Sequence, residues 1–292
     1  MHTPAPFKAF AYLDIDHPVV AWGAYRGVLV SAHAEAHSLQ APVSMMFAGM
    51  IQHQNNARLH NELLIEDVRA QQFPDHVSRL TGMYFFTDEV EANVAQSWGG
   101  HFRAENLVEV EVHPVRPYSK VDANWITYAE HDSTGRIDPT KRDWIVKYWA
   151  GEPFGAQPVW ETIVDGRAVV LSTEARERSY AKLARAFPNS LDTLEIARLG
   201  AAVGSDLGQT AAWITCIAPD RFYLAYYLNM RDAENPEFLE RLGNYDGPRN
   251  LNDIAPGKET FGLPDFRPFG CEFSTNVIGA SSSGSYPVHR RL

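Results

Sequence analysis

The chain has 292 residues and a formal net charge of −10, from 36 acidic and 26 basic residues. Its length suits one large domain or two modest ones, and the acidic balance argues against tight, nonspecific binding to a nucleic-acid backbone. Two cysteines, Cys216 and Cys271, are too few for a disulfide framework or a cysteine zinc site. We see no signal peptide and no run approaching the ~18 apolar residues of a membrane helix, so we expect a cytoplasmic protein without a membrane partner.

The first predicted elements are a strand and a helical region. Residues 19–32, VVAWGAYRGVLVSA, are rich in Val, Trp and Tyr and are predicted to form a strand interrupted by glycines. Residues 42–74 are predicted to be mostly helical, because apolar side chains recur at helical spacing opposite a charged side. Pro74 is expected to terminate this region.

The stretch RLTGMYFFTDEVEANVAQSWG, residues 79–99, is typical of a strand that turns sharply into a helix. GMYFFT is the predicted strand, and Thr87 or Asp88 is the predicted helix cap. Asp88 and Glu91 have the spacing of a capping box. Gly99 is expected to stop the helix.

The middle of the chain is predicted to contain more strands than helices. Residues 106–115 alternate apolar and charged residues, which indicates a half-exposed antiparallel strand. Residues 141–151 are a predicted short helix. In residues 158–172 two short strands flank Asp165-Gly166, a dipeptide typical of a β-hairpin turn.

The last part of the chain is predicted to mix helices and strands before a loop and a tail. The predicted elements are helices at 173–188 and 190–205, a strand–turn–strand unit at 212–230, a long loop at 244–270 and a small, polar tail at 279–292 that is mobile or forms a crossing arm. The fold class is therefore α+β with largely antiparallel strands. A dinucleotide-binding G-x-G-x-x-G motif and a P-loop are both absent from the sequence.

A histidine group raises the possibility of a metalloenzyme. His33 and His37 are four residues apart, and His53 and His60 follow. The pattern differs from H-E-x-x-H, because Glu35 lies midway between the first two histidines and would face away from them on a helix. Our main prediction therefore contains no metal, and a His-cluster metalloenzyme is kept as an alternative.

Three segments together resemble the three-motif layout of the ADP-ribosyltransferase superfamily: AYRGV (24–28), VSRLTGMYFFTDEVEANVAQSW (77–98) and PVWETIVDG (158–166). They also resemble a poorly characterised bacterial branch with E..R...FP..PSR and YW.G…WE signatures. The residues that match these signatures are Glu66, Arg69, Phe73, Pro74, Ser78, Arg79, Tyr148, Trp149, Gly151, Trp160 and Glu161.

The resemblance implies an ADP-ribosyltransferase-like core at residues 1–172, with split antiparallel sheets and interposed helices. Residues 173–292 are then a helical and strand extension, which either forms a separate lobe or completes the same domain. The implied activity is cleavage of the nicotinamide bond of NAD, with NAD as cosubstrate. The implied roles are Glu161 as the catalytic, charge-stabilising carboxylate, Arg26 as the dinucleotide anchor, Ser78 as the nicotinamide-side hydrogen bonder, and Tyr84 and Phe86 as the ring platform. His17 is the alternative to Arg26.

The chemistry of this reaction explains such a residue set. Loss of nicotinamide leaves an oxocarbenium-like ribosyl cation, which a nearby glutamate stabilises more than it stabilises the ground state. The acceptor would be a protein side chain, a nucleobase, a small molecule or water. Val159 stands where arginine-targeting members carry a second glutamate, so the resemblance does not imply an arginine acceptor.

Ordinary structural roles are the alternative for each of these residues. The residue patterns alone allow an outward-facing sheet position for Glu161, a surface ion pair for Arg26, a turn cap for Ser78 and core packing for the aromatic residues 84–86. A second hypothesis for the whole protein is a degenerate ADP-ribosyltransferase fold, in which residues 190–292 recognise a toxin, a phage protein or a ligand.

Overall fold

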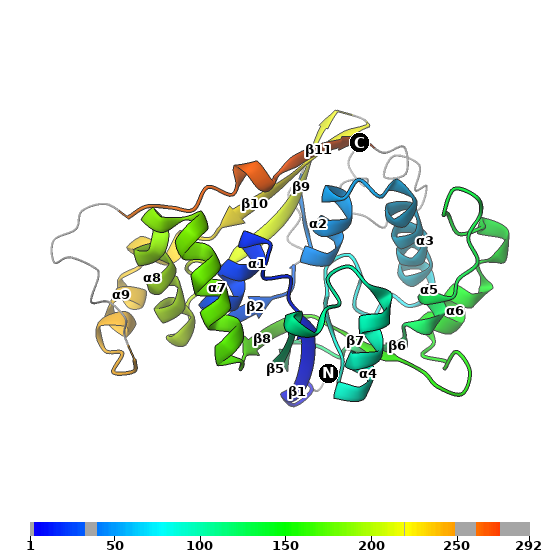
Figure 1. The fold of residues 1–292 in the computed structure, drawn as a ribbon, viewed down its shortest axis with the longest axis horizontal. Coiled ribbons are helices and arrows are strands. Elements are labelled where there is room, and N and C mark those ends of the chain that lie inside the picture. Colours follow the sequence, from blue (N-terminus) through cyan, green and yellow to red (C-terminus); the bar gives the residue numbers. More distant parts are fainter. Residues whose placement is uncertain (1–2, 33–39, 219, 249–260, 275–292) are drawn as a thin grey trace.

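The computed structural model describes residues 3–32, 40–218, 220–248 and 261–274. In this part of the chain helices and strands are interspersed, and every strand pairing is antiparallel (Figure 1). The predicted α+β class is thus confirmed. The predicted tail at 279–292 and residues 249–260 of the predicted loop lie outside the described residues.

The strands of the described residues form three sheets, with the orders β1-β5-β8-β2, β11-β10-β9-β3 and β4-β7-β6. An isolated bridge between Phe10 and Phe86 connects the first sheet to the end of β4. The strands are β1 (Phe7–Tyr12), β2 (Val28–Val30), β3 (Gln40–Val43), β4 (Met83–Phe85), β5 (Leu107–Pro114), β6 (Ser119–Asp122), β7 (Trp160–Val164), β8 (Gly166–Val170), β9 (Thr210–Ala218), β10 (Arg221–Leu228) and β11 (Cys271–Ser274).

The helices lie on both sides of these sheets, with α7, α8 and α9 on the left of Figure 1 and α2, α3 and α6 on the right. Most of them lie in segments predicted as helical from the sequence. The helices are α1 (Pro18–Arg26), α2 (Met45–Gln52), α3 (Asn56–Gln72), α4 (Glu89–Ala95), α5 (Asn124–Thr127), α6 (Asp143–Trp149), α7 (Thr173–Ala186), α8 (Leu191–Ala202) and α9 (Pro236–Gly243).

The strand predicted at residues 19–32 is wrong over most of its length, because Pro18–Arg26 forms helix α1. Pro18 suits the first turn of a helix, and Gly27 ends it in the left-handed conformation with φ of 90°. The apolar residues are buried all round this helix, which packs against α7 and α8. A helix surrounded by protein lacks the amphipathic period that would distinguish it from a strand. Within residues 19–32, the strand prediction holds only for β2 (Val28–Val30).

The two strands predicted within 158–172 exist as β7 and β8, but the predicted hairpin between them is wrong. β7 pairs with β4 and β6, whereas β8 pairs with β5 and β2. Asp165 alone separates the strands, and its carboxylate accepts a hydrogen bond from Arg116 Nε at 2.7 Å. A Cβ on Gly166 would collide with the carbonyl oxygen of His113. At Asp165-Gly166 the chain therefore passes from one sheet to another and does not form a hairpin turn.

Residues beyond 172 are interleaved with the earlier part of the chain. β9 pairs with β3, so one sheet contains strands from both parts. The indole nitrogen of Trp22 in α1 donates a hydrogen bond to the carbonyl oxygen of Gly208 at 2.9 Å. The largest hydrophobic cluster likewise contains buried residues from both parts.

The predicted strand-to-helix turn in the 79–99 stretch is confirmed. β4 is followed by α4, and the Asp88 carboxylate accepts hydrogen bonds from the backbone nitrogens of Val90 and Glu91. Such a cap satisfies N–H groups at the start of the helix that have no partner within it. In the described part of the chain, no helix combines the length and apolar character needed to cross a membrane.

Candidate functional site

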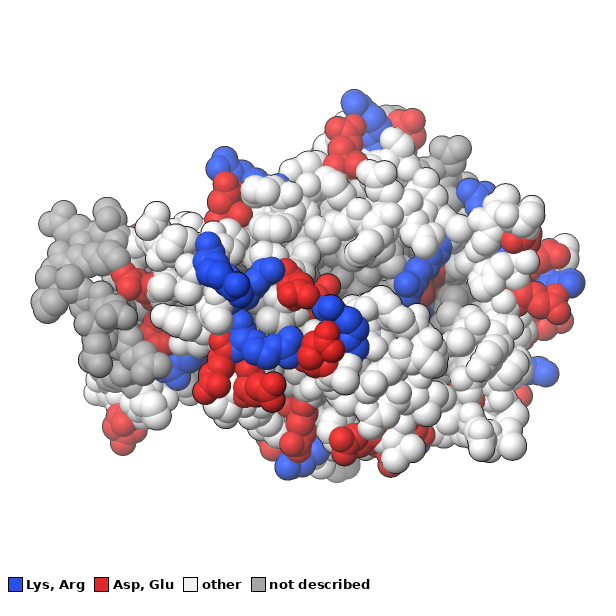
Figure 2. Space-filling view, in the orientation of Figure 1, with Lys and Arg blue, Asp and Glu red and all other residues white. Residues whose placement is uncertain are grey.

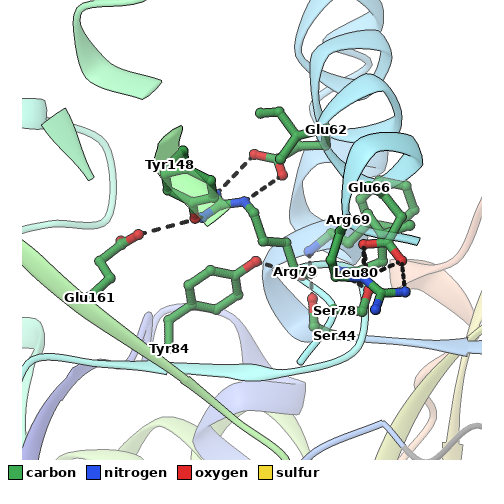
Figure 3. A network of polar contacts seen from close by, with 12 residues as sticks. Ser44, Glu62, Glu66, Arg69, Ser78, Arg79, Leu80, Tyr84, Tyr148 and Glu161 are labelled. Carbon is green, nitrogen blue, oxygen red and sulfur yellow. Dashed lines mark hydrogen bonds and ion pairs between the residues drawn. The ribbon is translucent and has the colours of Figure 1, made fainter. Parts of the chain in front are cut away.

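A buried arginine, Arg79, is the centre of a polar network between α3, α6 and β7 (Figure 3). Its Nε and Nη2 atoms donate to the two carboxylate oxygens of Glu62, at 2.8 and 3.0 Å. Its Nη1 atom donates to the hydroxyl of Tyr148 at 2.6 Å and lies 3.4 Å from Oε2 of Glu161. The Arg79 side chain is 6% exposed, so the whole guanidinium group is removed from solvent.

A second ion pair holds the loop that carries Arg79. Glu66 lies one helical turn after Glu62 and accepts hydrogen bonds from the guanidinium group of Arg69. Arg69 also donates to the carbonyl oxygen of His76 at 3.0 Å, and the Ser78 hydroxyl donates to Glu66 at 2.9 Å. These contacts connect α3 to the loop immediately before Arg79, so this ion pair positions the arginine.

Glu161 is on β7, the central strand of the three-stranded sheet, opposite Val121 of β6. The buried carboxylate of Asp122 fixes the approach to this strand, because it accepts hydrogen bonds from the backbone nitrogens of Phe154 and Val159. Strand geometry then determines the direction of the Glu161 side chain, which extends toward Arg79. Glu161 is therefore a buried residue on a rigid element, not an outward-facing sheet position.

The charges of this network do not balance. Arg79 is the only cation in direct contact with Glu62 and Glu161 among the described residues, and its bidentate bond is made with Glu62. Burial opposes the charge of Arg79, but Glu62, Tyr148 and Tyr84 together outweigh this effect, and the pKa of Arg79 is raised. Burial also raises the pKa of the Glu161 carboxyl, although Arg79 acts in the opposite direction. Two carboxylates thus share one guanidinium.

Glu161 has one oxygen available to a ligand. Oε2 faces Arg79, whereas Oε1 accepts no hydrogen bond from the residues that the structure describes. The residue lines a cavity of about 1840 Å³. Ligand pockets typically measure about 300–1,000 Å³, so this cavity has room for a large ligand or for two substrates.

One comparison with known proteins assigns a family. The sequence profile of the family described as "Protein of unknown function (DUF2441)" matches residues 28–177, just over half of the chain. The chain belongs to the DUF2441 family. A search of curated proteins found no match.

The DUF2441 segment contains every member of the network. Glu62, Arg79, Tyr148 and Glu161 all fall between residues 28 and 177, and so do the Glu66–Arg69 pair and Ser78. Other residues of the same segment line the cavity that Glu161 also lines, among them Arg58, Tyr84, Phe86, Trp98, His101 and Phe102. The matched part of this DUF2441 protein thus supplies the buried charges and much of the cavity wall.

The structure brings together some of the predicted site residues. Tyr84 lines the cavity beside Glu161, and its hydroxyl donates to the carbonyl oxygen of Arg79 at 2.5 Å. Phe86 also lines the cavity, but it is only 3% exposed because Tyr12 and Trp98 pack against it. Tyr84 therefore offers more ring surface than Phe86 does.

Arg26 and Ser78, two other predicted site residues, do not line the cavity that Glu161 lines. Ser78 is not among the cavity-lining residues, and its hydroxyl is engaged with Glu66. Arg26 is buried at the end of α1, where it donates to the carbonyl oxygens of Leu207, Val28 and Ser205. Arg26 lies outside the cavity wall that contains Glu161, so it forms neither the predicted surface ion pair nor a contact in this cavity.

His17, the alternative to Arg26, does line the cavity. It occupies the N-cap position of α1 without a side-chain capping hydrogen bond, and its ring packs against Tyr226 and Phe269 at centroid distances of 5.4 and 5.3 Å. Burial lowers the pKa of His17, with a further contribution from His53.

The histidine metal site cannot be assembled from described residues. His33 and His37 lie outside the described part of the chain. In the part that is described, no group of three or more His, Cys, Asp or Glu side chains is arranged to hold a metal ion. His53 Nδ1 instead lies 2.7 Å from the carbonyl oxygen of Gly49.

Sequence reasoning missed the roles of Glu62 and Tyr148. The sequence pattern of residues 42–74 places Glu62 only on the charged side of a helix, and Tyr148 is only one of the signature matches. A usable signal was present, because Glu62 and Glu66 are four residues apart and share a helix face. Arginines at 69 and 79 would then be expected to compensate two carboxylates that a long helix buries together.

Proposed function

We propose that this protein cleaves NAD at the nicotinamide N-glycosidic bond, as an ADP-ribosyltransferase or an NAD glycohydrolase, with Glu161 as the catalytic, charge-stabilising carboxylate. One observation carries the proposal: a buried carboxylate with a free oxygen lines a large cavity, while its neighbouring guanidinium is already bonded bidentately to Glu62. A site with such an excess of negative charge favours a ligand that develops positive charge.

Cleavage of NAD develops positive charge at one place, the ribose carbon C1′. When the bond from ribose C1′ to the nicotinamide nitrogen breaks, its electron pair leaves with nicotinamide and the ring becomes neutral. Positive charge then resides on the ribose ring, where the ionised Glu161 carboxylate stabilises it. An acceptor nucleophile adds to C1′ and loses its proton, which completes the transfer.

Arg79 favours the ionised form of Glu161 against the effect of burial, and the surrounding residues hold the side chain in place. Arg79 and Tyr148 hold one side of the network, and the backbone position of Glu161 is fixed by β7. The Tyr84 ring lies next to Arg79, with the guanidinium carbon 5.0 Å from the ring centroid. Tyr84 is thus a rigid aromatic surface on which the nicotinamide ring can stack.

The arrangement of the fold supports the same proposal at a coarser level. The chain has separate antiparallel sheets, and the strand bearing Glu161 is central in one of them. The residues quoted for the resemblance to the ADP-ribosyltransferase superfamily include Glu66, Arg69, Ser78, Arg79, Tyr148 and Glu161, which meet in one network. We therefore propose an ADP-ribosyltransferase-like core. Of the two first-motif candidates, we propose His17 because it lines the cavity.

Nicotinamide release from NAD tests this function. The purified protein should release nicotinamide, measured by chromatography, and Glu161→Gln should lower the rate by about 10²–10³-fold, because it removes a charge aimed at the transition state. Glu109→Gln is a matched control, since Glu109 is an exposed glutamate of strand β5 and forms an ion pair with Lys8. Binding of NAD without release would favour the degenerate binding module, and neither binding nor release would refute NAD chemistry.

A further inference from the structure

The hydroxyl of Tyr226, a residue of the cavity wall, is buried without a hydrogen-bond partner. Tyr226 is on β10 and is 7% exposed, and its hydroxyl bonds to no residue that the structure describes. Burial raises the pKa of Tyr226, with a further contribution from Cys271, so the hydroxyl stays protonated and can donate. Buried polar groups in folded proteins are nearly always hydrogen-bonded, so we expect this hydroxyl to bond to a molecule held in the cavity.

The position of the Tyr226 ring is fixed by its neighbours. Ala212 of β9 lies opposite Tyr226, and Val43 of β3 lies opposite Ala212. The ring of His17 packs against the Tyr226 ring at a centroid distance of 5.4 Å, and His17 Nε2 lies 3.3 Å from Nε2 of Gln52, the last residue of α2. These contacts bring the end of α2 into the neighbourhood of Tyr226.

Helix α2 presents an uncharged face to the same cavity. Met46, Gly49 and Met50 line the cavity, and their spacing of three and four residues places them on one side of the helix. The helix contains no charged residue, and the face shown in Figure 2 is mostly uncharged at its position. A Cβ added to Gly49 would meet nothing within 4 Å beyond its own stretch of helix. There is thus open space beside Gly49.

Methionine is concentrated around this cavity. All five methionines in the described part of the chain line it, namely Met45, Met46, Met50, Met83 and Met230. All but Met50 are only half-buried, although methionine is usually a buried residue. The flexible, polarisable thioether side chain adapts to apolar ligands of different shapes. The wall that α2 contributes therefore suits an apolar molecule.

We propose that the part of the cavity between α2 and Tyr226 binds an uncharged, apolar small molecule with one hydroxyl or carbonyl group, whose oxygen bonds to the Tyr226 hydroxyl. The body of the molecule packs against Met46 and Met50 and occupies the space beside Gly49. An ionised group would lose its hydration here without a compensating charge on α2. This site goes beyond the proposed function and does not depend on NAD binding.

Two probes that differ by one hydroxyl, 2-naphthol and naphthalene, test this site. Their binding is followed by NMR of protein labelled with [methyl-13C]methionine, and substitution of Met46 or Met50 by leucine assigns the two relevant signals. 2-Naphthol should shift both signals saturably. Tyr226→Phe should weaken 2-naphthol binding about 5-fold or more and change the Kd of naphthalene less than about 2-fold, because it removes one hydrogen bond. The variant loses a hydroxyl without a partner among the described residues, so it should remain folded.

Two further variants serve as controls. Tyr223→Phe is matched to Tyr226→Phe, because Tyr223 is on the same strand but is 36% exposed and does not line the cavity; it should change neither Kd. Gly49→Leu should weaken both probes about 10-fold or more, because its side chain would fill the space that the ligand occupies. Thermal unfolding of each variant establishes that the protein remains folded.

Two results would overturn the inference. Absence of saturable shifts at Met46 and Met50 in the wild type would refute the site. Equal losses of 2-naphthol and naphthalene binding in Tyr226→Phe would refute the hydrogen bond and, with it, the assigned class of ligand. Neither result depends on nicotinamide release, so failure of this inference and failure of the proposed function are distinguishable.

Discussion

Two buried arginines, Arg26 and Arg79, illustrate how different environments give the same residue type different roles. Arg26 is bonded to three backbone carbonyl oxygens and to no carboxylate among the described residues. Burial lowers the pKa of Arg26 to about 10. Arg79 lies between two carboxylates and a tyrosine hydroxyl, and its pKa is raised.

The contrast separates a structural connection from a candidate site. Arg26 connects α1 to the segment around Leu207, because its guanidinium group donates hydrogen bonds to the backbone carbonyl oxygens of Leu207 and Ser205. Arg79 instead compensates charges that face a cavity. Although both arginines are almost inaccessible to solvent, only the second belongs to a network that retains an excess charge for a ligand.

The largest expected effect is on the free energy of unfolding when each arginine is replaced by methionine. Arg79→Met leaves Glu62 and Glu161 buried without their cation, so we expect a loss of about 3–5 kcal/mol in the free energy of unfolding. Arg26→Met leaves neutral carbonyl groups unsatisfied and removes a buried charge, so we expect about 1–3 kcal/mol. Urea unfolding at pH 8 measures both values, and a smaller loss for Arg79→Met than for Arg26→Met would contradict the account.

A smaller effect on stability is expected for Ser78, whose hydroxyl we expect to have a structural role and not a ligand-binding one. Its hydroxyl donates to Glu66 and accepts from the backbone nitrogen of Leu80 at 3.1 Å, and it is not part of the cavity wall. Ser78→Ala should therefore lower stability by about 1 kcal/mol while changing the Kd for NAD less than 2-fold. A loss of NAD affinity with unchanged stability would return Ser78 to the nicotinamide-side role that the sequence predicted.

The smallest expected effect is a pH dependence due to Glu161. Because burial raises its pKa in the folded state, the folded protein binds this proton more tightly than the unfolded chain does. The Glu161 contribution therefore destabilises the fold as pH rises through the folded-state pKa, and it is relieved at lower pH. Glu161→Gln should be more stable than the wild type by about 1 kcal/mol at pH 8, with the difference shrinking as pH falls toward 5.

Chemical denaturation across pH 5–8 measures this difference. A constant difference between the two proteins would contradict a raised pKa for Glu161. Activity should follow the same titration in the opposite sense, because only the ionised carboxylate stabilises the ribosyl cation. The rate should therefore increase with pH through a value above the ordinary glutamate range.

Much of the secondary structure could be predicted from the sequence, because amphipathic periods and caps are local signals. The strand β5 and the capped helix α4 are examples, since alternation and the Asp88 cap are visible without tertiary contacts. The strand predicted at 19–32 failed because α1 is buried on all sides. The hairpin at Asp165-Gly166 failed because sheet membership depends on partners far along the chain.

The candidate site was predictable in its residue types but not in its connections. Glu161 and Tyr84 were expected to be near one another, and both line one cavity. The bidentate bond between Glu62 and Arg79 joins residues 17 positions apart that no local pattern connects. The role predicted for Arg26 also depended on contacts that no local pattern shows, because its hydrogen-bond partners include residues near 207.

The most direct test of the central claim is a paired measurement on Glu161→Gln, comparing kcat for nicotinamide release with the Kd for NAD. A carboxylate that acts on the developing cation should affect the transition state far more than the bound substrate. We predict a fall in kcat of at least 100-fold with a change in Kd of less than about 3-fold. An unchanged kcat, or a loss of Kd as large as the loss of kcat, would contradict the role assigned to Glu161.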